Sequence, residues 1–237
     1  MAEARTLLLF RPEPQATVFA DALEARAPGR FRTTTVPLVS IEPVASELDL
    51  RGVQGVAFSS INGVAAFAAR STARGMPAWC VGSATAAAAT EAGFAAASAG
   101  GDVVALAGLI AARHRPGGGD VLRVRGRHAA GDLGAMLSAA GVPSRSVILY
   151  DQVERPLPTT ARALLAAGGP LVLAFFSPRG ARLFAASVDA DSALAAAEAV
   201  SISAATDAAL AATGIGRRHV ARAPDREAML DALAALR

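Results

Sequence analysis

The stretch Val147-Ile148-Leu149-Tyr150-Asp151-Gln152-Val153-Glu154 decides how we interpret the fold. Its first half is a run of large apolar residues typical of a strand, its second half is polar, and it contains the only tyrosine of the chain. The residues that follow, Arg155-Pro156-Leu157-Pro158, prevent the strand from continuing, because proline cannot donate a ladder hydrogen bond. We therefore interpret this stretch as a crossing between two lobes.

An earlier stretch has the same build. In Thr35-Val36-Pro37-Leu38-Val39-Ser40-Ile41-Glu42-Pro43, prolines interrupt extended apolar residues and disfavour a helix. Two crossings predict that one domain is inserted into another, and the 237 residues of the chain suit two domains of ordinary size. The prediction is a discontinuous α/β domain of residues 1–35 and 156–237, an inserted α/β domain of residues 42–148, and connector strands at 36–41 and 149–155.

The rest of the chain alternates short apolar runs with longer stretches rich in alanine and leucine, a pattern typical of parallel-sheet α/β proteins. Strands are expected at residues 6–10, 31–35, 55–60, 78–82, 120–125, 171–177, 199–203 and 219–223. Helices are expected at residues 15–26, 62–70, 84–92, 102–112, 130–140, 159–167, 179–186, 205–212 and 226–236.

Parts of the chain repeat one another. The order of Phe, Ser, Gly and Phe in residues 58–67 recurs in residues 175–184, and residues 81–85 resemble residues 201–206. The first strand and helix likewise resemble residues 122–140. We therefore expect the two lobes to be copies of one α/β unit.

The net charge is +3, and all 23 basic residues are arginine. Arginine enrichment has two interpretations: genomic base composition, or the binding of carboxylate or phosphate groups, which the arginine fork holds through paired hydrogen bonds. The arginines are scattered singly and few aromatic residues accompany them, so a nucleic-acid partner is not expected.

Cysteine content and hydropathy indicate a cytoplasmic protein. Cys80 is the only cysteine, so no internal disulfide can form. The apolar run near the start, Thr6-Leu7-Leu8-Leu9-Phe10, is too short for a signal peptide. Alanine-rich segments are interrupted well before the roughly 20 apolar residues that a membrane span requires, so no membrane partner is expected.

Hydroxyl and arginine side chains follow the expected strands. In an open parallel sheet, ligands bind beyond the carboxyl ends of the strands, where helix N-termini offer unpaired N–H groups. Each serine or threonine taken alone can equally be a helix N-cap, but together, on two lobes that can face each other across a cleft, these residues would suit a large, flexible polyanion. The candidate binding residues are Arg11, Ser59, Ser60, Ser83, Thr85, Arg125, Ser177, Arg179, Ser203 and Thr206.

Other chemical signals are missing from the sequence. It has no glycine-rich phosphate loop and no serine in a nucleophile elbow. His114, His128 and His219 are isolated and lack metal-ligand spacing, which indicates surface or structural roles. Cys80 lies in an apolar strand, as a buried, inert thiol would. We therefore expect neither a metal nor an organic cofactor, which leaves a cofactor-free reaction or plain binding.

With these motifs in this order, the chain resembles the uroporphyrinogen-III synthase family over essentially its full length. The resemblance rests on the inserted-domain layout and on five motifs. The motifs are Phe-x-Ser-x-Asn-Gly-Val at 58–64, Val81-Gly82-Ser83-Ala84-Thr85-Ala86, Tyr150, Phe176-Ser177-Pro178 and Ala223-Pro224-Asp225. The chain departs from the family in one place: where the family often has Ile-Gly-x-Thr-Thr, it has Ile202-Ser203-Ala204-Ala205-Thr206, which leaves the role of Ser203 open while Thr206 still matches.

The resemblance implies two flavodoxin-like α/β domains joined by a two-strand connector, with the substrate in the cleft between them. It implies a cyclising lyase acting as a monomer on a small molecule, the linear tetrapyrrole polycarboxylate hydroxymethylbilane, which carries eight carboxylates. Ring A loses water, ring D attacks the resulting azafulvene, and a spiro intermediate leads to uroporphyrinogen III with ring D inverted. The protein would chiefly fold the substrate and assist the departure of hydroxide.

Tyr150 is the residue that the resemblance places at the cleft as the catalytic acid. A phenol stays protonated at neutral pH and can donate a hydrogen bond or proton to departing hydroxide. The alternative is that its ring packs against one lobe while its hydroxyl reaches water. Two other functions also remain open: a two-lobed anion- or tetrapyrrole-binding protein without catalysis, and an inactive homologue or regulator that keeps the fold.

Overall fold

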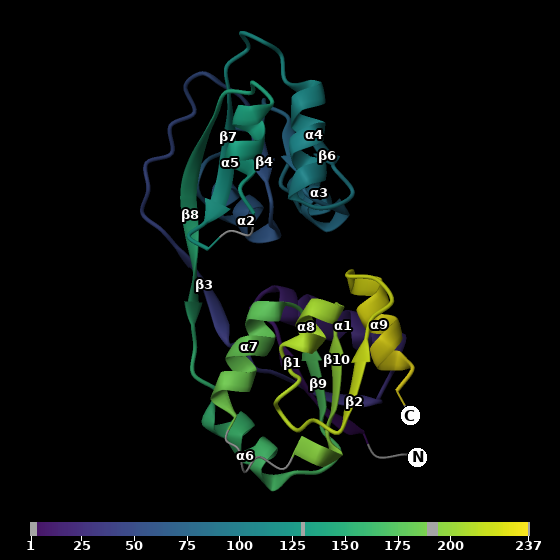
Figure 1. Cartoon of the computed structure of the whole chain (residues 1–237). Helices are drawn as coiled ribbons and strands as arrows, with labels where there is room; N and C mark the ends of the chain where they lie inside the picture. The colour runs from purple at the N-terminus through teal and green to yellow at the C-terminus, as the bar shows by residue number, and fades with distance from the viewer. Residues whose placement is uncertain (1–3, 129–130, 189–193, 237) are drawn as a thin grey trace. The chain divides into compact units, whose positions relative to one another are not determined.

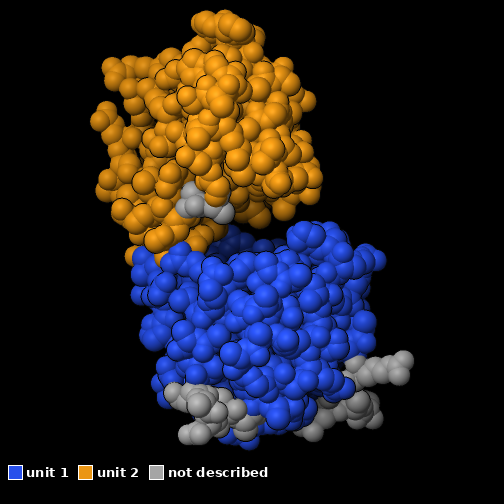
Figure 2. Space-filling model, in the orientation of Figure 1, with its two compact units in different colours: residues 1–40, 153–237 blue, residues 41–152 orange. Residues whose placement is uncertain are grey.

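The computed structural model describes residues 4–128, 131–188 and 194–236, and the chain divides into two compact units (Figure 1). Unit 1 comprises Met1–Ser40 and Val153–Arg237, and unit 2 comprises Ile41–Gln152 (Figure 2). Each unit is a largely parallel sheet with helices on both faces, which confirms the predicted α/β fold class. We treat the units one at a time.

Unit 1 is built on five strands: β1 (Arg5–Phe10), β2 (Phe31–Thr35), β9 (Val172–Phe175), β10 (Glu198–Ser201) and β11 (Arg217–Val220). Their order is β11-β10-β9-β1-β2, and every neighbouring pair is parallel. The helices are α1 (Gln15–Arg26), α6 (Thr159–Ala167), α7 (Pro178–Ser187), α8 (Ala204–Ala208) and α9 (Arg226–Ala234), with a short 3-10 turn at Leu194–Ala196.

The two faces of this sheet form separate cores. Side chains alternate along a strand, so Leu7 and Leu9 of β1 pack with α1 and α9, while Leu8 and Phe10 pack with α6 and α7. All four are buried, as a central parallel strand requires.

Unit 2 has six strands: β3 (Val39–Pro43), β4 (Val53–Phe58), β5 (Ala78–Cys80), β6 (Ala96–Ser98), β7 (Asp120–Gly126) and β8 (Ser144–Glu154). Their order is β3-β8-β7-β4-β5-β6, and β8, β7, β4, β5 and β6 pair in parallel. The helices are α2 (Ile61–Arg70), α3 (Ser83–Glu91), α4 (Val103–Arg113) and α5 (Leu133–Ala139).

The same alternation divides the core of unit 2. Leu122 and Val124 of β7 pack with α2 and α3, whereas Val121 packs with α4 and α5. Strands β3 and β8 both run past the limits of unit 2 into unit 1, and β8 ends at Glu154, directly before Arg155-Pro156. We keep the connector limits of 36–41 and 149–155 as a proposal.

The repeated sequence pattern has the same local structure in both units. Phe58 ends β4 and Phe175 ends β9. Each packs edge-on against a phenylalanine of the following helix: Phe58 on Phe67, with ring centroids 5.9 Å apart, and Phe175 on Phe184, with centroids 5.1 Å apart. One strand-to-helix unit therefore occurs twice.

Most expected elements are confirmed, and α1, α6 and β2 have the expected limits. Three differ. Strand β6 was not predicted, helix α8 ends at Ala208 instead of 212, and helix α5 begins at Leu133 instead of 130, a residue that lies outside the described ones.

Candidate functional site

The carboxyl edge of unit 1 brings together residues that are distant in sequence. Because β1, β9 and β10 are parallel neighbours, the residues that follow them lie side by side at one edge of the sheet. Arg11 follows β1, Phe176 and Ser177 follow β9, and Ser203 follows β10.

Arg11 is the most unusual of these residues. Its guanidinium lies over the ring of Phe176, 4.6 Å from the centroid. Burial lowers the pKa of Arg11, and the positive charge of Arg226 lowers it further. Among the described residues, no carboxylate forms an ion pair with Arg11. A half-buried cation without an acidic partner is poised to accept an anion. Arg226 was not among the predicted site residues, and its only sequence signal is its place directly after the Ala223-Pro224-Asp225 motif.

The hydroxyl groups at this edge are helix caps. Ser177 accepts a hydrogen bond from the backbone N–H of Gly180 (3.0 Å) and caps α7. Ser203 caps α8 through the N–H of Thr206 (3.3 Å) and lies 3.0 Å from its hydroxyl, while Thr206 is fully buried. Arg179 pairs with Glu154 at 3.3 Å. The N-cap alternative therefore holds for Ser177 and Ser203, and Thr206 would act by holding Ser203.

Unit 2 repeats this arrangement at the carboxyl edge of its own sheet. Ser60 caps α2 by accepting from the N–H of Asn62 (3.1 Å), and the exposed Ser59 precedes it. The N-cap of α3 is Gly82, so Ser83 is the first helical residue and is exposed, while Thr85 is buried.

Positions Gly82 and Thr85 of unit 2 correspond to Ser203 and Thr206 of unit 1. In each pair, the first residue is the N-cap and the second is the buried threonine three residues later. Ser203 therefore stands at a cap position that glycine can also occupy, which accounts for its departure from the motif.

Tyr150 lies beside the carboxyl end of β7. It pairs with Gly126 in the β7–β8 ladder, next to a register shift after Arg125, and its carbonyl accepts a hydrogen bond from the N–H of Arg127 (3.0 Å). Its ring covers Gly126 so closely that a Cβ there would lie 2.6 Å from a ring carbon. Tyr150 is only 4% exposed. The ring is thus packed, as the alternative interpretation requires, and its position at the strand end also fits a site.

Charged groups surround this position. Arg127 donates to Asp151 through Nε (2.8 Å), and His128 approaches the same carboxylate at 3.7 Å. Burial raises the pKa of Asp151, but hydrogen bonds from Arg127 and Gln152 outweigh that effect and lower it. Asp151 is therefore an ionised acceptor and not a proton donor at neutral pH.

A family model described as uroporphyrinogen-III synthase HemD matches residues 18–231. The chain belongs to the uroporphyrinogen-III synthase family. This membership confirms the resemblance and the activity that the sequence predicts: the chain is a cyclising lyase of the haem pathway, which converts hydroxymethylbilane into uroporphyrinogen III. Its substrate is a small-molecule tetrapyrrole.

Solved structures agree on the fold. The uroporphyrinogen-III synthetase of Helicobacter pylori 26695 is 19% identical, with a TM-score of 0.66 over 98% of this chain and 100% of that one. A mutant uroporphyrinogen III synthase from the extremely thermophilic bacterium Thermus thermophilus is 16% identical, with a TM-score of 0.56 over 97% of each chain. Among curated proteins, no sequence is similar enough to count as a match.

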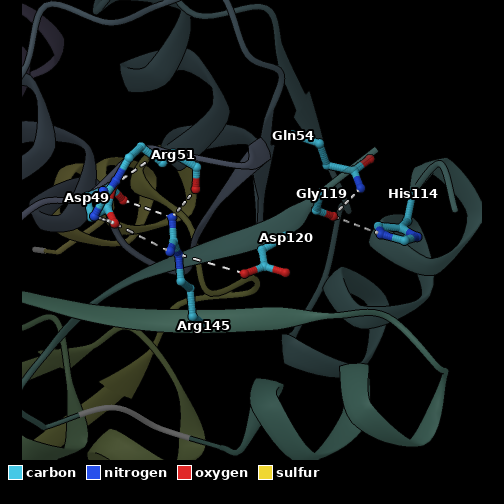
Figure 3. A network of polar contacts seen from close by, with 7 residues as sticks. All are labelled: Asp49, Arg51, Gln54, His114, Gly119, Asp120 and Arg145. Atoms are coloured by element: carbon cyan, nitrogen blue, oxygen red, sulfur yellow. Dashed lines mark hydrogen bonds and ion pairs between the residues drawn. The ribbon is translucent and has the colours of Figure 1, made fainter. Parts of the chain in front are cut away.

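In this synthase, the amino ends of the strands in each sheet, opposite the carboxyl edge described above, hold structural ion pairs. In unit 2, Asp49 accepts hydrogen bonds from Arg51 (2.9 and 2.8 Å), while Arg145 donates to the carbonyls of both residues and lies 3.9 Å from Asp120 (Figure 3). The hydrogen bonds from Arg51 lower the pKa of Asp49. These cations are already matched with acids, so this edge offers little to an anionic substrate.

In unit 1, the corresponding edge is organised around the buried carboxylate of Glu198. It pairs with Arg5 (2.9 Å), Arg217 (2.5 Å) and His219 (3.2 Å). Burial raises the pKa of Glu198, but its partners outweigh this and lower it. His219 therefore has the structural role that its sequence context indicates.

The remaining candidates for chemistry are few. Cys80 is buried, and burial raises the pKa of its thiol to about 11, which confirms an inert thiol. Within the described ranges, no three side chains of His, Cys, Asp or Glu are grouped as a metal site would be. Among those same residues, no helix is long and apolar enough to cross a membrane.

Proposed function

We propose that Tyr150 assists the departure of hydroxide from hydroxymethylbilane, and that the carboxyl edges of both units hold the carboxylates of the substrate. The observation that carries the proposal is the place of Tyr150, packed on Gly126 at the carboxyl end of β7 between the charged residues Arg125 and Arg127. The neighbouring Asp151 is an acceptor, so the hydroxyl of Tyr150 is the group that we assign as donor at this place.

The binding residues fall into two groups. Arg11 of unit 1 and Arg125 of unit 2 are the cations that would meet carboxylates directly, and Ser59 and Ser83 are exposed hydroxyls of unit 2. Arg125 donates to the carbonyls of Gly126 and Arg127 (both 3.1 Å), which fixes the direction of its guanidinium. The capping residues would instead hold the helix N-termini in place: Ser60, Ser177, Ser203 and the two buried threonines Thr85 and Thr206. Arg179, paired with Glu154, is the weakest member of the proposed set.

The proposed reaction needs little from the protein besides position. The pyrrole nitrogen of ring A drives the loss of hydroxide, and a hydrogen bond from a phenol lowers the barrier by stabilising the leaving oxygen. General acid assistance is worth about 10²–10⁴-fold, and the share of Tyr150 should fall at or below the low end of that range because the substrate supplies most of the driving force.

Replacement of Tyr150 by phenylalanine tests the proposal. An assay that separates the type I and type III isomers should show slow turnover that still gives the type III product, with a melting temperature within a few degrees of the parent protein. Tyr150→Leu, the matched variant, removes the packed ring as well and should melt clearly lower. Wild-type turnover in Tyr150→Phe would show that the hydroxyl has no chemical role.

We also propose the cytoplasm as its compartment and the monomer as its working form. The support for the cytoplasm is the single buried thiol of Cys80, which a reducing compartment leaves unpaired. Sedimentation analysis at assay concentrations tests the monomer, and a measured mass of two chains would refute it.

A further inference from the structure

Unit 2 contains a small pocket that the sequence analysis did not find. It lies at the carboxyl end of β4 and β7, has a volume of about 40 Å³, and is lined by Ser59, Arg123, Arg125, Asp132 and Leu133, among others. The pocket follows from the alternation of side chains: Ala57 pairs with Arg123 across the ladder, so both, together with Ser59 and Arg125, lie on the sheet face that α4 and α5 cover.

Arg123 is placed in this pocket by small neighbours. It occupies a position in β7 where an apolar residue would be expected, and its guanidinium lies against Gly134 of α5. A Cβ at Gly134 would lie 2.4 Å from a guanidinium nitrogen, so a larger residue there would displace the guanidinium from its present place. The Nε of Arg123 is buried, and none of the described residues accepts a hydrogen bond from it. A buried donor without an acceptor is uncommon in proteins and points to a ligand or water.

The charges in the pocket favour an anion. Burial lowers the pKa of Arg123, Asp132 raises it, and the second cation, Arg125, lowers it again. Asp132 carries the one carboxylate that acts on Arg123; it caps α5 by accepting from the N–H of Ala135 (3.0 Å), and no ion pair with Arg123 is formed among the described residues. Two guanidiniums therefore share one carboxylate, which leaves one positive charge facing the pocket.

The size of the pocket selects the ligand. A water needs roughly 10–15 Å³ of such volume, so the pocket holds about three waters or a single group of that size. A carboxylate has three heavy atoms and is planar, which matches the fork of an arginine. A pyrrole ring is too large.

We propose that this pocket binds one carboxylate arm of the substrate, with Arg123 as its main donor and Ser59 and Arg125 at its rim. This rests on the proposed function, since it assigns one carboxylate of hydroxymethylbilane to unit 2. It adds a specificity residue within the apolar part of a strand, where no motif indicates one.

The experiment uses the full chain with propionate as a probe for a single carboxylate arm. The Nε–Hε signals of the arginines are followed by ¹H–¹⁵N NMR while propionate is added. We expect the Arg123 signal to shift and saturate in the millimolar range. We also expect Arg123→Gln to raise the KM for hydroxymethylbilane about five- to tenfold while kcat stays within twofold. The control is Arg113→Gln, which removes an exposed charge at the far end of α4 in the same unit and should change neither.

A second variant keeps the test decisive if Arg123→Gln does not fold. Gly134→Ala keeps the charge but displaces the guanidinium from the place that we propose for carboxylate binding, so the propionate shift should change at least several-fold. An Arg123 signal that does not respond to propionate, or a KM for Arg123→Gln equal to that of Arg113→Gln, would overturn the inference, while slow turnover of Tyr150→Phe would still support the proposed function. Wild-type turnover of Tyr150→Phe would instead refute the proposed function, and the propionate titration would still test the pocket.

Discussion

Arg11→Met should weaken substrate binding without destabilising the protein. Arg11 is half-buried, is stacked on Phe176 and lies near Arg226, and no described carboxylate compensates its charge. Burial lowers its pKa, so the folded protein holds this cation at a free-energy penalty. Methionine retains an apolar contact with the ring of Phe176 and removes that penalty.

The magnitude follows from two opposing effects. Arg11→Met loses a cation–π contact, which is worth about 0.5–1 kcal/mol at an exposed site. It also removes the desolvation penalty of the guanidinium and its repulsion by Arg226, which offsets that loss. The melting temperature should therefore stay the same or rise by about 1–3 °C. A hydrogen bond to a charged group is worth about 1.5–3 kcal/mol, less some screening at this half-exposed edge. A loss of about 1–2 kcal/mol corresponds to a KM raised roughly five- to thirtyfold.

The assay is steady-state turnover of hydroxymethylbilane with isomer separation, combined with thermal melting of the free protein. The control is Arg32→Met, which removes an exposed arginine from β2 of the same unit and should change neither KM nor stability. The decisive signature is weaker binding together with unchanged or higher stability. If Arg11→Met melts several degrees lower with an unchanged KM, Arg11 is a structural residue and the reasoning is wrong.

Two further predictions concern stability and packing. Glu198→Gln should lower the free energy of unfolding by about 2 kcal/mol at pH 7, or about 4–8 °C in melting temperature, because it leaves the cations around a buried carboxylate unmatched. Because the folded-state pKa of Glu198 is lowered, the ionised carboxylate stabilises the protein fully above the ordinary glutamate pKa, and this stabilisation is lost as the pH falls through the lowered value. The difference in stability between Glu198→Gln and wild type should therefore shrink on acidification, and a constant difference would contradict the prediction. Gly126→Ala should displace the ring of Tyr150, which should lower the free energy of unfolding by about 1–3 kcal/mol and also lower turnover. In the Tyr150→Phe background, the same change should lower turnover less. If the two changes lower turnover independently in the double variant, Gly126 and the hydroxyl of Tyr150 are not coupled.

The fold could be predicted because its signals are local. Each core strand is a short apolar run, and the prolines after Glu154 mark the end of β8. Strand β6, Ala96–Ser98, was missed because three small residues carry no β-branched or aromatic signal and pair only through the edge of β5. Helix α8 was predicted too long because the alanines that follow it favour a helix as much as those within it, so the sequence does not mark the end of the helix at Ala208.

The candidate site could be predicted only in part, for the same reason. Ser60, Ser177 and Ser203 are found because an N-cap follows a strand at a fixed spacing. The environment of Arg123 depends on Gly134 in another element, and no local pattern records that contact. Whether a hydroxyl is exposed or buried is equally non-local: Thr206 and Thr85 look like site residues in sequence but are covered in the fold.

The distribution of arginine charge supports one functional edge in each unit. At the amino ends of the strands, four arginines are matched with acids: Arg5, Arg51, Arg145 and Arg217. Asp49 raises the pKa of Arg51. Among the arginines that the structure describes, burial lowers the pKa of Arg11 and Arg123, which belong to different units and both lie toward the carboxyl ends of strands. Arg127 and Arg179 are counterexamples at those edges, because Asp151 pairs with Arg127 and Glu154 pairs with Arg179. A protein selected for stability alone would gain by pairing Arg11 and Arg123 or replacing them with apolar residues. Two such arginines, one in each unit and without an ion pair among the described residues, are therefore the electrostatic feature that we expect a polycarboxylate substrate to satisfy.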